Sequence, residues 1–251
     1  MDKRNDADQE PGAATGTRGP DQAGERAATG QAVVTAADVR AFIARAERAL
    51  VRHRQLLDRL DARLGDGDHG ENMTVGFGHA VRALAAPDAT AAPDGAEDVG
   101  ELLRRLGYLV TANVGGAGGS LYGTALIEAG FAIAGSAAIG PDELARAFDA
   151  AAHGVARRGR CRAGDKTVFD ALRPAADAFA GALRDGHDAV HALRAATRAA
   201  SRGMRATRPM VARRGLALRL GDRSRGHQDP GATSCFLLVR AMLQRDDEAA
   251  A

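Results

Sequence analysis

The sequence is poor in aromatic residues and in cysteine. Its 251 residues include no tryptophan, 2 tyrosines, 7 phenylalanines and 2 cysteines. Cys161 and Cys235 lie far apart, and neither belongs to a CxxC or Cys/His ligand spacing, which argues against a disulfide framework and a zinc site. The 34 basic side chains are nearly balanced by 32 acidic ones, and no aromatic residues are interleaved with a basic cluster. We therefore expect reduced cysteines and no nucleic-acid partner.

Long apolar runs are also missing. The N-terminal stretch MDKRNDADQEPGAATG lacks the apolar segment of a signal peptide, and later apolar stretches are interrupted by charges before they reach the length of a membrane span. The sequence therefore predicts a cytoplasmic protein with no membrane partner. Residues 1–33 hold almost no large apolar side chains, so we predict a disordered N-terminal tail followed by one helical domain over residues 34–248.

Alanine, leucine and arginine dominate the rest of the chain and favour helices. Thr35 suits an N-cap, and apolar residues recur at helical spacing from Val39 to Leu60, which predicts one long amphipathic helix ending near Gly65. No series of alternating β-branched residues predicts a sheet. The fold class is therefore all-α, with about eight helices in a bundle or closed barrel. Further helices are predicted at 71–86, 96–112, 120–134, 141–158, 168–184, 188–206 and 231–246.

Three acidic residues surround the end of the first helix. Asp61 lies near that end, and Asp66 and Asp68 occupy the turn GDGDHG that follows it. Carboxylates this close repel one another unless a cation lies between them, and a few hard oxygen ligands suit a Mg²⁺ ion that also binds phosphate. A DGD turn alone is more often a solvated helix cap. A calcium EF-hand does not fit, because Gly70 stands where its fifth-position ligand belongs.

Two further loops have the composition of anion-binding sites. The segment NVGGAGGSLYGTAL enters a helix whose first backbone N–H groups offer a nest for phosphate, although such glycines also serve close packing. The segment from Gly159 to Thr167 imitates a P-loop, but Asp165 precedes the lysine and no buried strand leads into it. Lys166 is unusual in this arginine-rich chain, since Lys3 is the only other lysine.

The last loop opens the final helix with Asp229, Pro230 and Gly231, and Arg223 and His227 come shortly before it. A phosphate or ribose near that helix start would be favoured electrostatically, so Arg223 is counted among the candidate nucleotide contacts.

Rare residues also fall in these loops. Asn72 and Asn113 are the only asparagines beyond the tail, and a chemical requirement explains their positions better than chance. His69 and His227 lie in Gly/Asp loops, where a structural and a functional role are both open. The other histidines lie on predicted helices, where we expect structural or solvated roles.

Taken in order, GDGDHG, NVGGAGGSLYGT, GDKTVFDAL and GHQDPGATS resemble the L subunit of dihydroxyacetone kinase, the DhaL family of nucleotide-binding domains. The resemblance covers about residues 36–246. It implies an all-α, eight-helix antiparallel barrel whose loops at one end hold ADP or ATP with two Mg²⁺ ions. Asp61, Asp66 and Asp68 would ligate the magnesium pair and carry the catalytic role. The nucleotide contacts that it implies are His69, Asn72, Asn113, Gly116, Ala117, Gly118, Gly119, Gly164, Asp165, Thr167, Asp229, Pro230 and Gly231.

The same resemblance implies a phosphotransferase that is incomplete alone. Its substrate, dihydroxyacetone, would be held on a histidine of a separate K subunit. In the phosphoenolpyruvate-dependent branch, ADP stays bound and is rephosphorylated by a phosphohistidine carrier, the M subunit, whereas in the ATP-dependent branch the nucleotide exchanges. A free-standing L chain favours the first branch. Apolar faces on eight helices neither demand nor exclude a homodimer.

Two alternatives stay open. One is an ATP-dependent kinase subunit for a related keto-sugar such as erythrulose, since the partner chooses the sugar. The other is a non-catalytic, nucleotide-sensing partner, because the chain departs from the family pattern. Gly118 and Ser120 replace serine and proline in the phosphate loop, Leu216 replaces a basic residue, and Arg219 and Asp222 replace an aromatic residue and a glutamate. The basic residues left to compensate for Leu216 are Arg213, Arg214 and Arg219.

Overall fold

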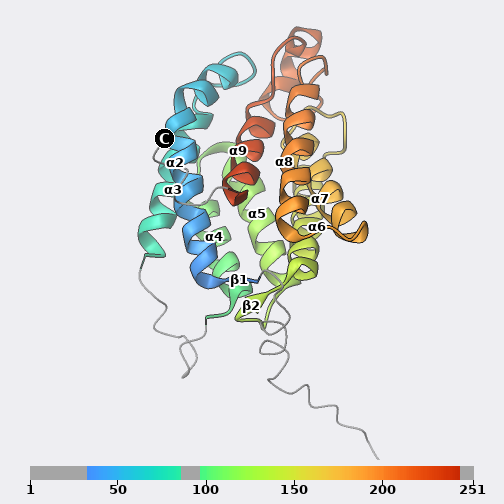
Figure 1. Ribbon diagram of the computed structural model, residues 1–251. Coiled ribbons are helices and arrows are strands. Elements are labelled where there is room, and N and C mark those ends of the chain that lie inside the picture. Colours follow the sequence, from blue (N-terminus) through green and yellow to red (C-terminus); the bar gives the residue numbers. More distant parts are fainter. Residues whose placement is uncertain (1–32, 86–96, 244–251) are drawn as a thin grey trace, which may run out of the picture.

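The structure is a computed structural model that describes residues 33–85 and 97–243. Residues 1–32 of the predicted tail, and residues 86–96 and 244–248 of the predicted domain, lie outside the described residues. Eight α-helices within the described ranges stand side by side (Figure 1). They are α2 (Ala36–Asp61), α3 (His69–Ala83), α4 (Val99–Asn113), α5 (Gly116–Ala132), α6 (Pro141–Gly159), α7 (Phe169–Arg184), α8 (Ala189–Ala206) and α9 (Pro230–Leu243).

These helices close into a ring. Each one packs against the next in sequence, and α9 packs against both α8 and α2, so the first and last helices complete the barrel. The all-α, eight-helix barrel expected from the sequence and its family resemblance is therefore confirmed. No described helix combines the length and the apolar character that a membrane span requires.

The direction of the helices determines where the motifs meet. Neighbouring helices in an up-and-down barrel are antiparallel, so every second connection lies at the same end. The connections α2–α3, α4–α5, α6–α7 and α8–α9 share one end, and they carry the four motifs of the sequence. At the opposite end, β1 (Val34–Thr35) pairs with β2 (Ala138–Ile139) in an antiparallel register that sets Val34 opposite Ile139 (Figure 1).

Local sequence explains how the first helix begins. The hydroxyl of Thr35 accepts a hydrogen bond from the backbone N–H of Asp38, and the Asp38 carboxylate accepts the N–H of Thr35 at 2.9 Å. This reciprocal capping box satisfies two backbone donors that the helix cannot pair internally. The expectation that Thr35 is the N-cap is confirmed.

Glycine allows α4 and α5 to pack closely. A Cβ atom on Gly100 would lie 2.5 Å from the carbonyl oxygen of Gly130, and one on Gly107 would lie 2.8 Å from that of Gly123. Real Cβ atoms do not approach a carbonyl this closely, so larger residues at these positions would force the two helices apart. The close pairing brings the start of α5 against the end of α4, where the glycine-rich motif lies.

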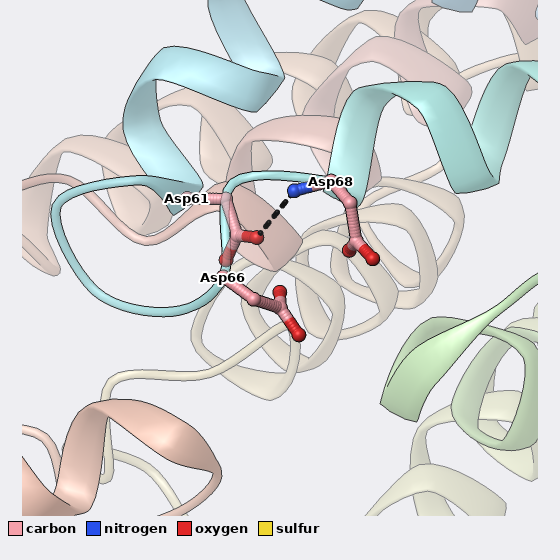
Figure 2. A group of neighbouring side chains, drawn as sticks. All are labelled: Asp61, Asp66 and Asp68. Carbon is pink, nitrogen blue, oxygen red and sulfur yellow. Dashed lines mark hydrogen bonds between the residues drawn. The ribbon is translucent and has the colours of Figure 1, made fainter.

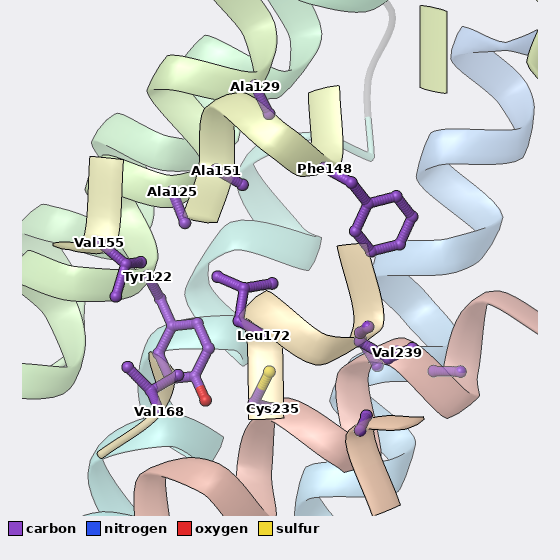
Figure 3. Packing of buried hydrophobic residues seen from close by; sticks show 14 of the residues in the cluster. Tyr122, Ala125, Ala129, Phe148, Ala151, Val155, Val168, Leu172, Cys235 and Val239 are labelled. Carbon is purple, nitrogen blue, oxygen red and sulfur yellow. The ribbon is translucent and has the colours of Figure 1, made fainter. Parts of the chain in front are cut away.

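The interior of the barrel is apolar. Figure 3 shows Tyr122, Phe148, Leu172 and Val239 converging from α5, α6, α7 and α9. An apolar cavity of about 230 Å³ remains among such side chains, and Tyr122 lines both this cavity and the pocket described below. The Tyr122 ring therefore forms part of the wall between the barrel interior and the end that carries the motifs.

Three features differ from the sequence-based expectation. The helix α5 begins at Gly116 rather than near residue 120, so the glycine-rich motif forms its first turn. A 3₁₀ segment, η1 (Leu216–Ser224), which has a break at Gly221, occupies part of the long α8–α9 connection, and it was not predicted. The strands β1 and β2 were not predicted either, because two residues are too few to show a period.

Candidate functional site

A pocket of about 390 Å³ opens at the end of the barrel where the four motif-bearing connections meet. The residues that line it come from all four connections and from the helix turns beside them. The candidate site residues from the sequence that line this pocket are Asp61, Asp66, Asp68, His69, Asn72, Gly116, Ala117, Gly118, Thr167, Asp229, Pro230 and Gly231.

Three carboxylates converge on one side of the pocket. Asp61 is the last residue of α2, and its Oδ2 accepts the backbone N–H groups of Gly67 at 2.9 Å and of Asp68 at 3.2 Å. These bonds hold the turn against the end of α2, and Figure 2 shows the one from Asp68. Gly67 supplies the φ of +87° that the turn requires. One oxygen from each of Asp61, Asp66 and Asp68 lies within 4.8 Å of the other two.

The electrostatics of this acidic cluster favour a bound cation. Asp66 and Asp68 are exposed, whereas Asp61 is partly buried. Burial raises the pKa of Asp61, and the neighbouring Asp66 carboxylate raises it further. The cluster therefore carries unfavourable carboxylate repulsion in the absence of a cation, and its three hard oxygen donors match the ligand preference of Mg²⁺.

The start of α5 presents backbone donors to the same pocket. The first N–H groups of a helix have no partner within the helix, and Gly116, Ala117 and Gly118 place no bulky side chain over them. Gly116 has a φ of +64°, which a glycine adopts without strain. This geometry suits a negatively charged group bound in the pocket that the acidic cluster also lines.

A hydrogen-bonded chain joins three helices at the base of the pocket. The Nε2 atom of His69 on α3 lies 2.9 Å from the hydroxyl oxygen of Ser234 on α9. That hydroxyl lies 2.7 Å from the hydroxyl of Tyr122 on α5. Burial lowers the pKa of His69 to about 4, despite the opposing effect of the Asp58 and Asp66 carboxylates. His69 is therefore neutral at pH 7 and can hold one hydrogen bond on each ring nitrogen.

The α6–α7 connection is built around buried polar groups. The Asp170 carboxylate accepts the N–H groups of Gly164 at 2.6 Å and of Thr167 at 2.8 Å. The ammonium group of Lys166 donates to the carbonyl oxygens of Thr207, at 2.7 Å, and of His227. The Lys166 side chain thereby ties this connection to both ends of the α8–α9 connection.

Asp229 lies at the entrance to α9 and lines the pocket. Its Oδ2 accepts the backbone N–H of Ala232 at 2.6 Å, which holds the first turn of the helix. Burial raises the pKa of Asp229 to about 7, although this N–H and the nearby Lys166 act in the opposite direction. A carboxyl group with a pKa near 7 therefore lies where the pocket, α9 and the α6–α7 connection meet.

The sequence of this chain is similar to that of known proteins over most of its length. Residues 63–244 match the DAK2 domain family. The chain belongs to that family. Over 194 residues it is 35% identical to the ADP-binding subunit DhaL of PEP-dependent dihydroxyacetone kinase 2 from Listeria innocua, and the match covers 77% of this chain and 87% of that protein.

Two further comparisons extend this family relationship. The chain is 39% identical over 189 residues to the L-erythrulose 1-kinase of Mycolicibacterium smegmatis, a match that covers 74% of this chain and 31% of that protein. The dihydroxyacetone kinase from C. freundii, crystallised in complex with AMP-PNP and Mg²⁺, superposes with a TM-score of 0.61 at 20% identity, covering 97% of this chain and 38% of that one. The structural likeness supports the DAK2 fold.

Five candidate residues of this DAK2 domain do not line the pocket, namely Asn113, Gly119, Gly164, Asp165 and Arg223. The Asn113 amide donates to the carbonyl of Leu109 on its own helix at 2.8 Å. Gly119 faces α4, where a Cβ atom would overlap the carbonyl oxygen of Val114. Gly164 and Asp165 shape the α6–α7 connection, and Arg223 is exposed on η1. The structure therefore brings none of these five to the pocket wall.

Several residues of the DAK2 pocket were not among the sequence candidates. They include Tyr122, Arg158, Cys161, Lys166, Arg214 and Leu216. Lys166 was noted in the sequence because lysine is rare in this chain. Leu216 was noted as a departure from the family pattern, and Arg214 as a basic residue that could compensate for it. Arg158 and Tyr122 lie on regular helices, where nothing in the local sequence distinguishes a pocket residue from its neighbours.

Proposed function

We propose that this chain is the ADP-binding subunit of a phosphoenolpyruvate-dependent dihydroxyacetone kinase. It would pass a phosphoryl group to dihydroxyacetone held on a separate K subunit and be rephosphorylated by a phosphohistidine carrier, the M subunit. The observation that carries this proposal is the pocket that Asp61, Asp66 and Asp68 line together with the N-terminus of α5. Similarity to a subunit of that description over 87% of its length supports the same reading.

The acidic cluster would hold the metal. In this proposal Asp61, Asp66 and Asp68 bind two Mg²⁺ ions, which would neutralise charge on the phosphates and on the group in transfer. The two backbone hydrogen bonds to Asp61 keep its carboxylate oriented toward its neighbours. A bound cation would relieve the repulsion that the fold imposes among the three carboxylates, and this relief would contribute to the metal affinity.

The rest of the pocket would hold the nucleotide. Backbone N–H groups of Gly116, Ala117 and Gly118 would bind phosphate oxygens, while Thr167 and Asp229 would border the nucleoside. Phosphoryl transfer needs alignment and charge stabilisation more than it needs a general base. The task of this chain would therefore be to fix the phosphates at the open end of the barrel.

The surface beside the pocket suits a protein partner. Leu216 and Leu218 lie on η1 with 47% and 54% of their surfaces exposed, and Leu216 also lines the pocket. Apolar side chains at the mouth of a nucleotide site would be covered when a partner docks and water is excluded. We assign this surface to the K subunit, which would bring its bound sugar to the phosphate.

Native mass spectrometry of the freshly purified chain, with and without a chelator, tests the proposal. Retained ADP that leaves with magnesium on chelation is expected for a nucleotide carrier. Exchangeable ATP in place of retained ADP would favour the ATP-dependent branch. A chain that binds neither nucleotide, even with added Mg²⁺, would refute both.

The second candidate is an ATP-dependent kinase subunit acting on erythrulose. The 39% identity to the L-erythrulose 1-kinase favours it, although that protein is much longer than the region matched. Transfer assays with purified K and M subunits distinguish the two, since the first candidate uses phosphoenolpyruvate through the carrier and the second uses ATP alone.

A further inference from the structure

Three basic side chains line the pocket, and two of them are already engaged within the protein. Lys166 directs its ammonium group at two backbone carbonyls. Arg214 forms an ion pair with the buried Asp165, with Nε and Oδ2 3.3 Å apart. The positive charges of Lys166 and Arg214 are therefore largely engaged by protein groups in the connections that shape the pocket.

Arg158 is placed differently. It lies in the last turn of α6, and its Nε donates to the hydroxyl of Ser120 at 2.5 Å. Among the described residues, no carboxylate lies within 4.0 Å of its guanidinium group, and this bond is its one hydrogen bond. Both terminal nitrogens of Arg158 thus keep their donors available in the pocket.

The position of Ser120 determines where that charge is held. Ser120 lies one turn into α5 and lines the same pocket as Gly116 and Gly118. A guanidinium group tied to Ser120 is therefore beside the helix start whose N–H groups face the pocket. Guanidinium and backbone N–H groups that converge on one space form a site for phosphate oxygens.

We propose that Arg158 binds a phosphate group of the nucleotide and that Ser120 is its positioning residue. This inference rests on the proposed nucleotide-binding function. Arg158 would supply the positive side chain that the α5 nest itself lacks, while the acidic cluster supplies metal on the other side. The fork of the guanidinium group matches two phosphate oxygens, which a lysine ammonium cannot do in the same geometry.

Calorimetric titration of the full chain with ADP and Mg²⁺ tests the proposal. Arg158→Gln should weaken ADP binding about tenfold to hundredfold, as expected for the loss of charge-assisted hydrogen bonds. Arg158→Lys should weaken ADP binding less than Arg158→Gln does, because it keeps the positive charge. The melting temperature of the nucleotide-free chain should not change, because Arg158 is exposed and makes one internal hydrogen bond.

The neighbouring Arg157 is a matched control. It lies on the same turn but pairs with Glu128 and does not line the pocket, so Arg157→Gln should bind ADP as the wild type does. Ser120→Ala should weaken binding by about threefold in the wild-type background and have no effect in the Arg158→Gln background. The inference is overturned if the wild type binds ADP and Arg158→Gln binds it equally well. Failure of the wild type to bind ADP would instead remove the proposed function on which it rests.

Discussion

The hydroxyl of Tyr122 lies 2.7 Å from the hydroxyl of Ser234, and both also contact the carbonyl oxygen of Gly231, at 2.9 and 3.0 Å. Ser234 in turn lies within hydrogen-bond distance of His69. Tyr122 thus fixes the start of α9 against α5, while its ring faces the apolar interior of the barrel (Figure 3). The shape of the pocket therefore depends on a side chain that is anchored in the core.

Tyr122→Phe should lower the free energy of unfolding by about 1 kcal/mol, because one buried hydroxyl and its hydrogen bonds are lost while the ring remains. ADP affinity should fall several-fold, since Gly231 and His69 both line the pocket. Urea unfolding and calorimetry measure the two effects. The control is Tyr108→Phe, at a residue 57% exposed on α4, which should change neither quantity. Equal behaviour of the two variants would show that the Tyr122 hydroxyl has no organising role.

Asp66→Asn should separate metal binding from folding. With chelator present, the variant should be as stable as the wild type or slightly more stable, because Asp66 raises the pKa of Asp61 through unfavourable repulsion. With Mg²⁺ present, the wild type should gain stability and the variant should gain much less. Thermal unfolding across a magnesium titration measures both. Asp142→Asn, an exposed acid at the opposite end of the barrel, should keep the full magnesium response. A normal response in Asp66→Asn would remove Asp66 from the metal site.

The helices could be predicted from the Gly-, Pro- or Asp-containing breaks between them and, in most of them, from an apolar period; each predicted helical segment has a counterpart. The helix α5 lacks such a period, and its glycines and breaks alone marked it. A helical period reports which face of a helix is buried. It does not report which helix covers that face, so the sequence pattern left a bundle and a closed barrel open, and the ring from α2 to α9 was expected from the family resemblance. The strand pair and η1 had no pattern long enough to detect.

The candidate site divides in the same way. Asp61, Asp66 and Asp68 could be grouped because they are close in sequence, and one turn brings them together. Tyr122 and Ser234 lie 112 residues apart, and only the closure of the barrel makes them neighbours. The glycine-rich motif was expected to act as a unit. As part of a helix, however, it turns Gly119 toward α4 and away from the pocket.

Asp229 should make stability depend on pH. Its pKa is raised from 3.8 to about 7 in the folded chain, so the folded state binds a proton that the unfolded state releases between these values. The stabilisation that comes from this proton, measured as free energy of unfolding, is therefore fully present below about pH 4 and is lost as the pH rises toward 7. Asp229→Asn, which can still accept the N–H of Ala232, should gain stability relative to the wild type over that interval. Urea unfolding at pH 5 and pH 8 in chelator, compared between the two proteins, measures the difference. A constant difference would show that Asp229 titrates normally.

Lys166 should contribute to stability rather than to phosphate binding. It is 2% exposed, has a φ of +62°, and donates to the carbonyl oxygens of Thr207 and His227. Lys166→Met keeps the length of the side chain but leaves both carbonyls without this donor. The free energy of unfolding, measured in urea, should fall by about 2–4 kcal/mol. Arg162→Met is the control: this residue lies in the same connection with 83% of its side chain exposed, and its substitution should leave the free energy of unfolding almost unchanged. If Lys166→Met instead kept its stability and lost ADP affinity, the ammonium group would serve the nucleotide and the α8–α9 connection would be held by other contacts.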